Sequence, residues 1–168
     1  ELFTVPKPTI AAINGHAIAG GCIVACACDY RIMVRGSGRI GLPELRVGVP
    51  FPLAATEILR HSIGSRLAQE AMLVGNNVGA EESVTHGFVD ELVEPDRLLP
   101  RALEVAATMG ASPSESYART KLDLRRPVIE TWARLGEAHD RATLEAWDSP
   151  AVREAMKAFV ERTLRKSG

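Results

Sequence analysis

The stretch from Lys7 to Cys22 reads K-P-T-I-A-A-I-N-G-H-A-I-A-G-G-C and carries the most information about how the chain folds. Residues 9–14 form an apolar run between Pro8 and Gly15, which predicts a β-strand. The pair Gly20-Gly21 then opens a second apolar run, residues 22–28, which we expect to be a buried helix. The predicted order is therefore a strand, a glycine turn and the N-terminus of a helix.

Outward from this stretch, strands and helices alternate. We expect strands or extended segments at residues 29–34, 39–44 and 88–93, and helices at residues 53–60, 65–73, 81–86 and 97–109. Gly64 is expected to separate the first two of these helices. The alternation predicts an α/β fold with a parallel or mixed sheet.

The last third of the chain is expected to be helical. Ser112 should cap a helix in which Pro113 takes the first position and Glu115 closes a capping box. Pro127 and Pro150 are expected to begin two further helices, over residues 128–147 and 151–165. The last helix has an apolar stripe that must pack on this chain or on a neighbouring subunit, made of Val152, Met156, Phe159, Val160 and Thr163.

Composition narrows the class of protein. The 168 residues are 46% hydrophobic and 24% charged, which predicts a folded core. Twenty Lys and Arg residues balance twenty-one Asp and Glu residues, so there is no basic field to hold nucleic acid or an anionic membrane. The sequence has neither an apolar run of the ~18 residues typical of a membrane helix nor a signal peptide. We therefore expect no nucleic-acid or membrane partner.

The three cysteines, Cys22, Cys26 and Cys28, lie close together in one apolar run. Three thiols cannot all pair with one another, which argues against a disulfide framework. Only His16 is near them in sequence, so a metal site lacks ligands. We expect buried thiols, no metal, and a reducing compartment.

Two positions are the main candidates for chemistry. Gly20, at a helix start, leaves backbone N–H groups free to stabilise negative charge on an oxygen; the alternative is a tight turn with no ligand. Glu44 stands among apolar residues, where burial would raise its pKa into the range of a group that takes and returns a proton; the alternative is a solvated loop residue.

For the other polar and aromatic residues we expect structural or surface roles. His16 could line a pocket near the glycine pair, but a packed or exposed histidine is the expected alternative. His86 precedes Gly87 and is expected at a helix C-terminus. Arg125-Arg126 is interpreted as a solvated turn, and Trp132 and Trp147 as core or interface residues.

Taken together, several segments resemble the crotonase superfamily, the enoyl-CoA hydratases and isomerases. The segment Lys7 to Cys22 is similar to the signature K-P-x-I-A-A-[IV]-x-G-x-A-x-G-G-G of that superfamily. Four further segments, spread over most of the chain, also resemble it: residues 29–32, 40–45, 73–93 and 158–162. The resemblance implies an α/β, crotonase-like (ClpP/crotonase) spiral of ββα units with a helical C-terminal part.

The resemblance also implies a division of the chain. Residues 1–94 would be the C-terminal part of the crotonase core, with the oxyanion turn and the catalytic glutamate. Residues 95–168 would be a helical region for oligomerisation and for covering the substrate. The N-terminal portion of the family fold, with a second N–H donor for the oxyanion, has no counterpart here, so we expect the 168 residues alone to be inactive.

For the site, the resemblance implies an acyl-CoA thioester substrate. Gly20 would donate its N–H to the enolate oxygen, Glu44 would be the acid and base, and Ile23 and Phe51 would wall an apolar pocket. Coenzyme A would be part of the substrate, with no separate cofactor. The resemblance further implies a homotrimer or a dimer of trimers, and we expect a cytoplasmic protein, with a mitochondrial one left open.

Departures from the family pattern favour one reaction. Hydratases have a second glutamate directly after G-G-C, where this sequence has Ile23, while Glu44 remains. This pattern resembles the Δ3,Δ2-enoyl-CoA isomerases, which shift a double bond with one carboxylate. Two alternatives stay open: another crotonase-fold enzyme, such as a hydratase, hydrolase or decarboxylase, and a non-catalytic acyl-CoA-binding paralogue.

Overall fold

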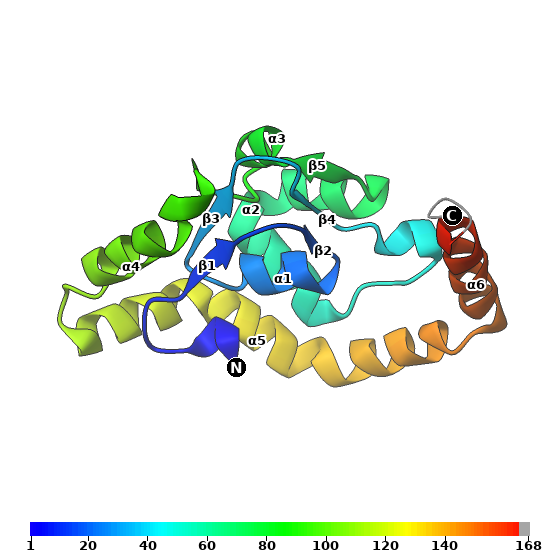
Figure 1. Cartoon of the computed structure of the whole chain (residues 1–168). Coiled ribbons are helices and arrows are strands. Elements are labelled where there is room, and N and C mark those ends of the chain that lie inside the picture. The colour runs from blue at the N-terminus through cyan, green and yellow to red at the C-terminus, as the bar shows by residue number, and fades with distance from the viewer. Residues whose placement is uncertain (165–168) are drawn as a thin grey trace.

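The computed structural model describes residues 1–164, with side chains described as far as residue 161. After a short 3₁₀-helix, η1 (Leu2–Thr4), the chain forms two successive ββα units (Figure 1). The first consists of β1 (Ile10–Ile13), β2 (Ala17–Ile18) and α1 (Gly20–Cys26). The second consists of β3 (Tyr30–Val34), β4 (Arg39–Gly41), the short 3₁₀-helix η2 (Glu44–Val47) and α2 (Leu53–Val74).

The two strands of each unit belong to different sheets. One sheet has the order β1-β3-β6 and is parallel, with β6 at Glu91–Val93. The other has the order β2-β4-β5, in which β2 and β4 are parallel and β5 (Asn77–Gly79) is antiparallel to β4. The expected α/β fold with parallel and mixed sheets is confirmed.

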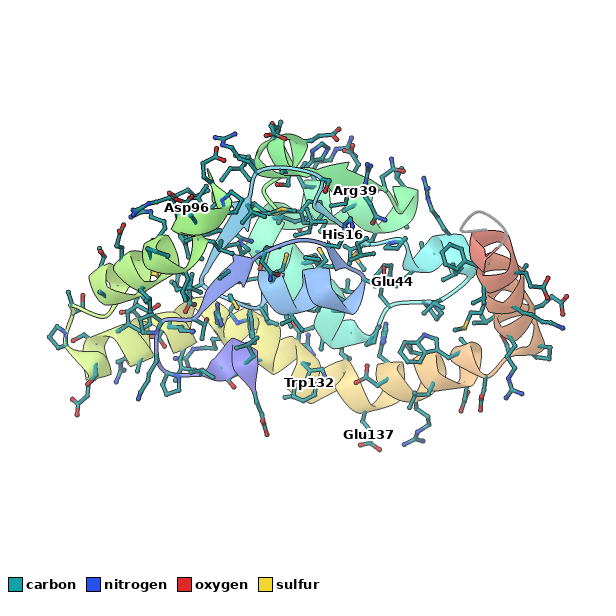
Figure 2. The ribbon with its side chains drawn as sticks, in the orientation of Figure 1. His16, Arg39, Glu44, Asp96, Trp132 and Glu137 are labelled. Atoms are coloured by element: carbon teal, nitrogen blue, oxygen red, sulfur yellow. The ribbon has the colours of Figure 1, made fainter. Side chains whose placement is uncertain are left out.

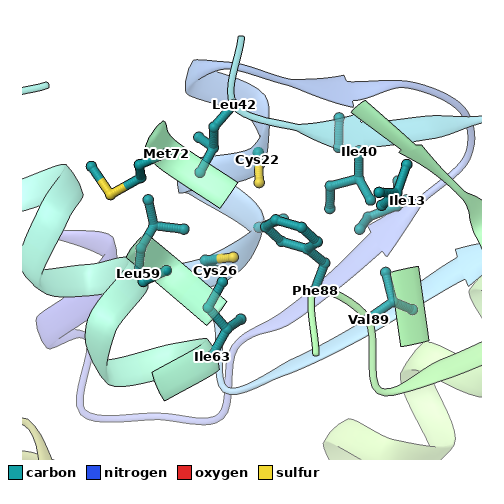
Figure 3. Close-up of a cluster of buried hydrophobic side chains, with 14 of the residues drawn as sticks. Ile13, Cys22, Cys26, Ile40, Leu42, Leu59, Ile63, Met72, Phe88 and Val89 are labelled. Carbon is teal, nitrogen blue, oxygen red and sulfur yellow. The ribbon is translucent and has the colours of Figure 1, made fainter. Parts of the chain in front are cut away.

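The main apolar core lies between the two sheets and helices α1 and α2. Figure 3 shows the ring of Phe88 near its centre, with the thiols of Cys22 and Cys26 on one side and Ile13 and Val89 on the other. Cys22 and Cys26 are fully buried free thiols, whereas Cys28 is half-buried. The expectation of buried thiols therefore holds for the first two cysteines.

Three helices follow the strands. They are α4 (Leu98–Met109), α5 (Ser114–Trp147) and α6 (Pro150–Leu164), and the short helix α3 (Ala80–Thr85) comes before β6. Helix α4 covers β1 and β3 through a second cluster that contains Ile32, Leu98 and Val105. Figure 1 shows α5 running along one side of the molecule and α6 turning back toward η2. The predicted division at residues 94 and 95 remains a prediction.

A buried group of charges attaches α5 to the first sheet. Asp29 accepts hydrogen bonds from Lys121 Nζ at 2.6 Å, from Arg125 Nη2 at 2.6 Å and from Tyr117 Oη at 3.2 Å. Lys121 and Arg125 are 5% and 4% exposed, so the interpretation of Arg125 as part of a solvated turn is wrong. Burial of two cations requires a carboxylate partner, and Asp29, the residue directly before β3, supplies it.

Pro127 lies inside α5 and does not begin a helix, contrary to the prediction. Proline lacks the N–H for the intrahelical bond and costs about 3 kcal/mol in a helix interior. Buried residues on both sides of it, Arg125 and Val128, hold the helix against the rest of the molecule. This packing outweighs the local preference of the proline.

The predicted cap of α5 is also wrong. The helix begins at Ser114 with Pro113 as its N-cap, and it has no side-chain cap hydrogen bond, so Ser112 and Glu115 form no capping box. The carbonyl of Pro113 accepts the first helical bond, from the Tyr117 N–H at 3.0 Å.

Other differences concern short segments. The expected extended segment at residues 39–44 ends at Gly41, because the Pro43 and Glu44 carbonyls accept turn hydrogen bonds from Arg46 and Val49. The expected strand at residues 88–93 is reduced to β6, because the N–H groups of Phe88 and Val89 donate back to Ser83. The short strands β2 and β5 were not predicted. Gly64 does interrupt α2, with φ 79° and ψ 154°.

Only part of the predicted stripe on α6 is covered. Val152 is buried, whereas Met156 and Val160 are 47% and 53% exposed. Arg165, the predicted end of this helix, and the side chain of Thr163 lie outside the described residues. Within the described chain no helix is long and apolar enough to cross a membrane.

Candidate active site

The parallel pairing of β2 with β4 brings the two main candidates to one edge of a sheet. Ile18 lies opposite Gly41 in the register. Gly20 follows β2 by two residues and Glu44 follows β4 by three, so the chain reaches both positions just beyond the same edge. Figure 2 shows Glu44 beside the end of the ribbon where β2 passes into α1. Residues that are 24 positions apart in the sequence thus become neighbours.

The turn between β2 and α1 is held by hydrogen bonds around Ala19. Its N–H donates to the Gly41 carbonyl at 2.8 Å, and its carbonyl accepts from Cys22 at 2.9 Å. Ala19 has φ 56°, a conformation that non-glycine residues rarely adopt, so the strain of the turn falls on Ala19. Strain at such a position is typical of functional sites.

The glycine pair itself faces open space. A Cβ atom at Gly20 or Gly21 would meet no heavy atom within 4 Å, and neither residue has a positive φ. Within the described part of the chain, no backbone carbonyl accepts from either N–H outside the helix. Internal packing therefore does not require glycine here, and the free N–H groups leave room for the close approach of a ligand.

Glu44 is a half-buried carboxylate with little polar support. Its Oε2 atom is buried and has no hydrogen-bond partner among the described residues. Burial raises the pKa of the carboxyl above its ordinary value, and a hydrogen bond from its own backbone N–H opposes this only in part. The charge of Glu44 also contributes to the raised pKa of Cys22, after the hydrogen bond with Cys26 and burial. Glu44 is therefore near α1 and suited to proton exchange.

Neighbouring elements hold the turn that carries Glu44. Arg46 donates to the carbonyl of Val74 and to the side chain of Asn76, at the end of α2. On the other side, Trp147 Nε1–H donates to the carbonyl of Pro50 at 2.8 Å. Gly48, with φ 75°, lies against α6, because a Cβ there would be 3.3 Å from the Cβ of Ala155.

Sequence reasoning missed these supporting contacts. They join positions 28 to 107 residues apart, and no local pattern around Arg46, Gly48 or Trp147 indicates their partners. Trp132 is 51% exposed and is not a core residue. Trp147 is 38% exposed and holds the loop after η2 through its indole N–H.

The two predicted pocket residues pack into the main core. Phe51 is buried and Ile23 is half-buried, and both belong to or contact the same apolar cluster. Ile23 lies one turn into α1 and directly after Cys22, on the helix whose start holds Gly20. Their role as walls of a substrate pocket remains a prediction.

The histidines lie outside this site. His16 is exposed, and its Nδ1 accepts from the Arg39 N–H at 3.1 Å; Figure 2 shows both residues. His86 is the C-cap of α3, as predicted. Among residues that the structure describes, no group of three or more His, Cys, Asp or Glu side chains could hold a metal ion.

An open N–H turn and a desolvated carboxylate, each following the second strand of a ββα unit, define a site suited to stabilising and protonating an enolate. A sequence model of the family described as enoyl-CoA hydratase/isomerase matches residues 1–166. The chain belongs to this family, within the crotonase superfamily.

Its relatives include enzymes of both kinds. The chain is 30% identical over 165 residues to the short-chain-enoyl-CoA hydratase of Clostridium acetobutylicum, covering 96% of the chain and 62% of that protein. It is 31% identical over 169 residues to the mitochondrial enoyl-CoA delta isomerase 1 of Rattus norvegicus, covering 100% of the chain and 58% of that protein.

Among solved structures, human mitochondrial delta3-delta2-enoyl-CoA isomerase matches with a TM-score of 0.93 at 27% identity, covering 99% of the chain and 65% of that structure. The crotonase-like fold is therefore confirmed. The chain spans about three fifths of the length of the curated relatives it matches.

Proposed function

We propose that the protein is an enoyl-CoA isomerase that moves a double bond between C3 and C2 of an acyl-CoA thioester. The observation that carries the proposal is the Glu44 carboxylate, with one buried, unpartnered oxygen, just beyond the same sheet edge as the open glycine turn. Relatives at about 30% identity include both hydratases and isomerases, so the choice of reaction rests on the site residues.

In the proposed mechanism Glu44 is the only acid and base. Its carboxylate removes a proton from C2 of a 3-enoyl thioester, and the electron pair moves into the carbonyl to form a dienolate. The N–H of Gly20 donates to the enolate oxygen, a kind of contact whose loss typically costs about 10²–10³ in rate. Glu44 then returns the proton to C4, which leaves the double bond between C2 and C3. No water is consumed.

Ile23 supports isomerisation over hydration. Addition of water to a 2-enoyl thioester needs a group that orients and deprotonates the water as well as a group that protonates carbon. The resemblance to the family puts the second carboxylate of hydratases at the position of Ile23, and an isoleucine cannot orient a water. An unassisted Glu44 suits a reaction in which one proton is moved.

Product analysis of the full-length protein tests the proposal. With 3-enoyl-CoA and 2-enoyl-CoA as substrates, we expect interconversion of the two isomers and little 3-hydroxyacyl-CoA. Hydration of 2-enoyl-CoA faster than the shift of its double bond would establish a hydratase instead. The absence of both reactions, in a protein that still binds acyl-CoA, would favour a non-catalytic paralogue.

A pair of variants at Ile23 sharpens this test. Ile23→Glu supplies a second carboxylate, and repulsion between it and Glu44 raises one of the two pKa values, so that an acid and a base can share a water. We expect at least a trace of hydration in this variant. Ile23→Gln has the same size and no charge, and we expect it to hydrate no more than the parent.

We also propose that the protein assembles as a homotrimer or a dimer of trimers. Exposed apolar side chains on α6, such as Met156 and Val160, support a subunit contact at this helix. Size-exclusion chromatography with light scattering measures the mass of the full-length protein in solution and so gives the number of subunits. A monomer would show that these side chains stay exposed in solution.

The cytoplasmic or mitochondrial location also remains a prediction, which imaging of the tagged full-length protein tests.

A further inference from the structure

The connection between α2 and β5 contacts both segments that build the candidate active site. It consists of residues 75–77, from the glycine that ends α2 to the first residue of β5, and is called the 75–77 connection below. Because β5 pairs with β4, Asn77 lies opposite Gly41, the last residue of β4 (Figure 1). The 75–77 connection therefore passes the strand end from which the chain continues to Glu44.

On one side the 75–77 connection packs closely on Gly41. A Cβ atom at Gly41 would collide with the carbonyl oxygen of Asn76 and lie 2.7 Å from Asn77 Oδ1, so only glycine fits there. The Gly41 carbonyl accepts the Ala19 N–H at 2.8 Å, one residue before Gly20. The 75–77 connection thus supports the strand end that holds the glycine turn.

On the other side the 75–77 connection holds Arg46, two residues after Glu44. Arg46 Nε donates to the carbonyl of Val74 at 3.4 Å, and its Nη2 donates to Asn76 Oδ1. The stem of the side chain crosses Gly75, where a Cβ atom would be 3.1 Å from Arg46 Cγ. One arginine therefore attaches the turn of Glu44 to the end of α2 and to the 75–77 connection.

Arg46 makes these contacts without acting as a countercharge for Glu44. Both of its acceptors are neutral, and it forms no ion pair among the described residues. Burial and the backbone N–H of Glu44 account for the raised pKa of that carboxyl, and the charge of Arg46 is not among the causes. The planar guanidinium group thus fixes the geometry of the turn and leaves the carboxylate unpaired.

We propose that the 75–77 connection sets the spacing between the oxyanion turn at Gly20 and the base Glu44, and that Arg46 is the positioning residue that fixes Glu44 to it. The inference rests on the proposed function, in which one substrate contacts the Gly20 N–H and the Glu44 carboxylate together. A misplacement of about 1 Å in such a geometry can cost about 10²-fold in rate. A residue that takes no part in proton transfer can therefore control the rate.

Steady-state kinetics of the full-length protein test the role of Arg46. Arg46→Met keeps the stem and removes both donors, so kcat for isomerisation should fall by about fivefold to 10²-fold while KM changes by less than about twofold. Arg46→Lys keeps one charged donor and should recover part of the loss. Arg66→Met is the matched control, because Arg66 forms an exposed ion pair with Glu70 on α2. Equal kcat values in Arg46→Met and Arg66→Met would overturn the proposal.

Asn76→Ala tests whether Arg46 acts through the 75–77 connection. This variant removes the side-chain acceptor and keeps the backbone carbonyl that packs on Gly41. If Arg46 acts through Asn76, the double variant should lose no more kcat than Arg46→Met loses alone. Losses that multiply would show two independent effects and would overturn the role of the 75–77 connection.

Hydrogen exchange gives a readout that does not depend on the reaction. The Val49 N–H donates to the Glu44 carbonyl at 3.0 Å, and the Ala19 N–H donates to Gly41. Arg46→Met should speed exchange at both amides by about threefold or more, and Arg66→Met at neither. Faster exchange at Val49 alone would overturn the link between the two halves of the site. A parent that does not isomerise would refute the proposed function, whereas the exchange rates would still confirm or refute this link.

Discussion

Glu44 and Asp29 are both carboxylates removed from water, but the protein treats them in opposite ways. Asp29 accepts five hydrogen bonds, from the Thr9 N–H and hydroxyl and from Lys121, Arg125 and Tyr117. Burial alone would raise its pKa, but these donors and the charges of Lys121 and Arg125 outweigh burial, and the pKa is lowered. Among the described residues no cation offsets the burial of Glu44, and burial raises its pKa.

The difference separates a structural role from a chemical one. A carboxylate that accepts hydrogen bonds on both oxygens is stabilised in its charged form and gives the chain a fixed point between β1, β3 and α5. A carboxylate with an unused oxygen changes its protonation state at low cost, which is what a general acid and base requires. Exchanging the environments of the two groups should exchange these properties, and the variants below test each half of the contrast.

The largest effect is expected for Glu44→Gln. An amide cannot take a proton from carbon, so isomerisation by the full-length protein should fall by about 10²–10⁴, as is typical when a general acid–base group is removed. Acyl-CoA binding and the circular dichroism spectrum should stay unchanged, because Glu44 forms no ion pair within the described part of the chain. Steady-state kinetics measure the loss, and activity within tenfold of the parent would exclude Glu44 as the base.

Asp29→Asn should lower the free energy of unfolding without acting on the reaction itself. The variant leaves Lys121 and Arg125 buried without a countercharge, and breaking a buried ion pair costs about 3–5 kcal/mol. Urea unfolding of parent and variant gives the difference. Asp123→Asn is the control. Asp123 lies on α5, the helix of Lys121 and Arg125, and forms exposed ion pairs, whose loss costs less than about 1 kcal/mol. Equal losses in the two variants would show that burial of the Asp29 cluster contributes nothing.

The pH dependence of stability should have opposite signs at the two sites. The pKa of Asp29 is lower in the folded state, so its contribution is present above the ordinary aspartate pKa of about 4 and is lost as the pH falls through the folded value. The stability advantage of the parent over Asp29→Asn should therefore shrink in acid.

Glu44 shows the reverse relation. Its folded pKa is raised, so ionisation costs the folded state more than the unfolded state once the pH passes the ordinary glutamate value of about 4.3. The stability of Glu44→Gln relative to the parent should rise with pH between the ordinary glutamate pKa and the raised pKa of Glu44 in the folded state. Above the raised pKa the difference should level off. Unfolding curves from about pH 2 to pH 8 measure both differences, the Asp29 change below about pH 4 and the Glu44 change above it, and parallel slopes for the two variants would contradict the contrast between the carboxylates.

The same two residues show what the sequence does and does not reveal. Glu44 could be identified as a candidate because it stands in an apolar segment that also resembles the family pattern, but the sequence left open whether it is desolvated or a solvated loop residue. Asp29 could not be assigned its partners, since Lys121 and Arg125 are 92 and 96 residues away. Because the contact with Asp29 cannot be read from the local sequence, Arg125-Arg126 is predicted to be a solvated turn and Pro127 to begin a helix.

Local pattern also predicts elements unequally. The strand at β1 and the helix at α4 follow from apolar runs with clear ends. The strands β2 and β5 have two and three residues and exist only because β4 lies between them. Such short pairings are set by tertiary contacts, and yet β2 is the strand that carries Gly20 to the site of Glu44.

The smallest effect concerns the support of Glu44 from a distance. Trp147 Nε1–H donates to the Pro50 carbonyl, six residues after Glu44, and Trp147→Phe removes this bond while keeping an aromatic ring. A single hydrogen bond contributes about 1 kcal/mol to stability, so the loss in the free energy of unfolding should be of that size. Because the loop would be held less firmly, kcat should fall by at most about tenfold, which corresponds to 1.4 kcal/mol.

A positioning role should change kcat more than KM and leave the pH at half-maximal activity in place, since the burial of Glu44 is retained. Trp132→Phe is the matched control, as Trp132 is 51% exposed on the same helix. Both variants would be compared by steady-state kinetics over a range of pH. Equal kcat values in the two variants would show that α5 supports the fold without helping to place Glu44. A lower kcat in Trp147→Phe alone would extend the contrast between the carboxylates: Asp29 is fixed by its own hydrogen bonds, and Glu44 by contacts to the backbone around it.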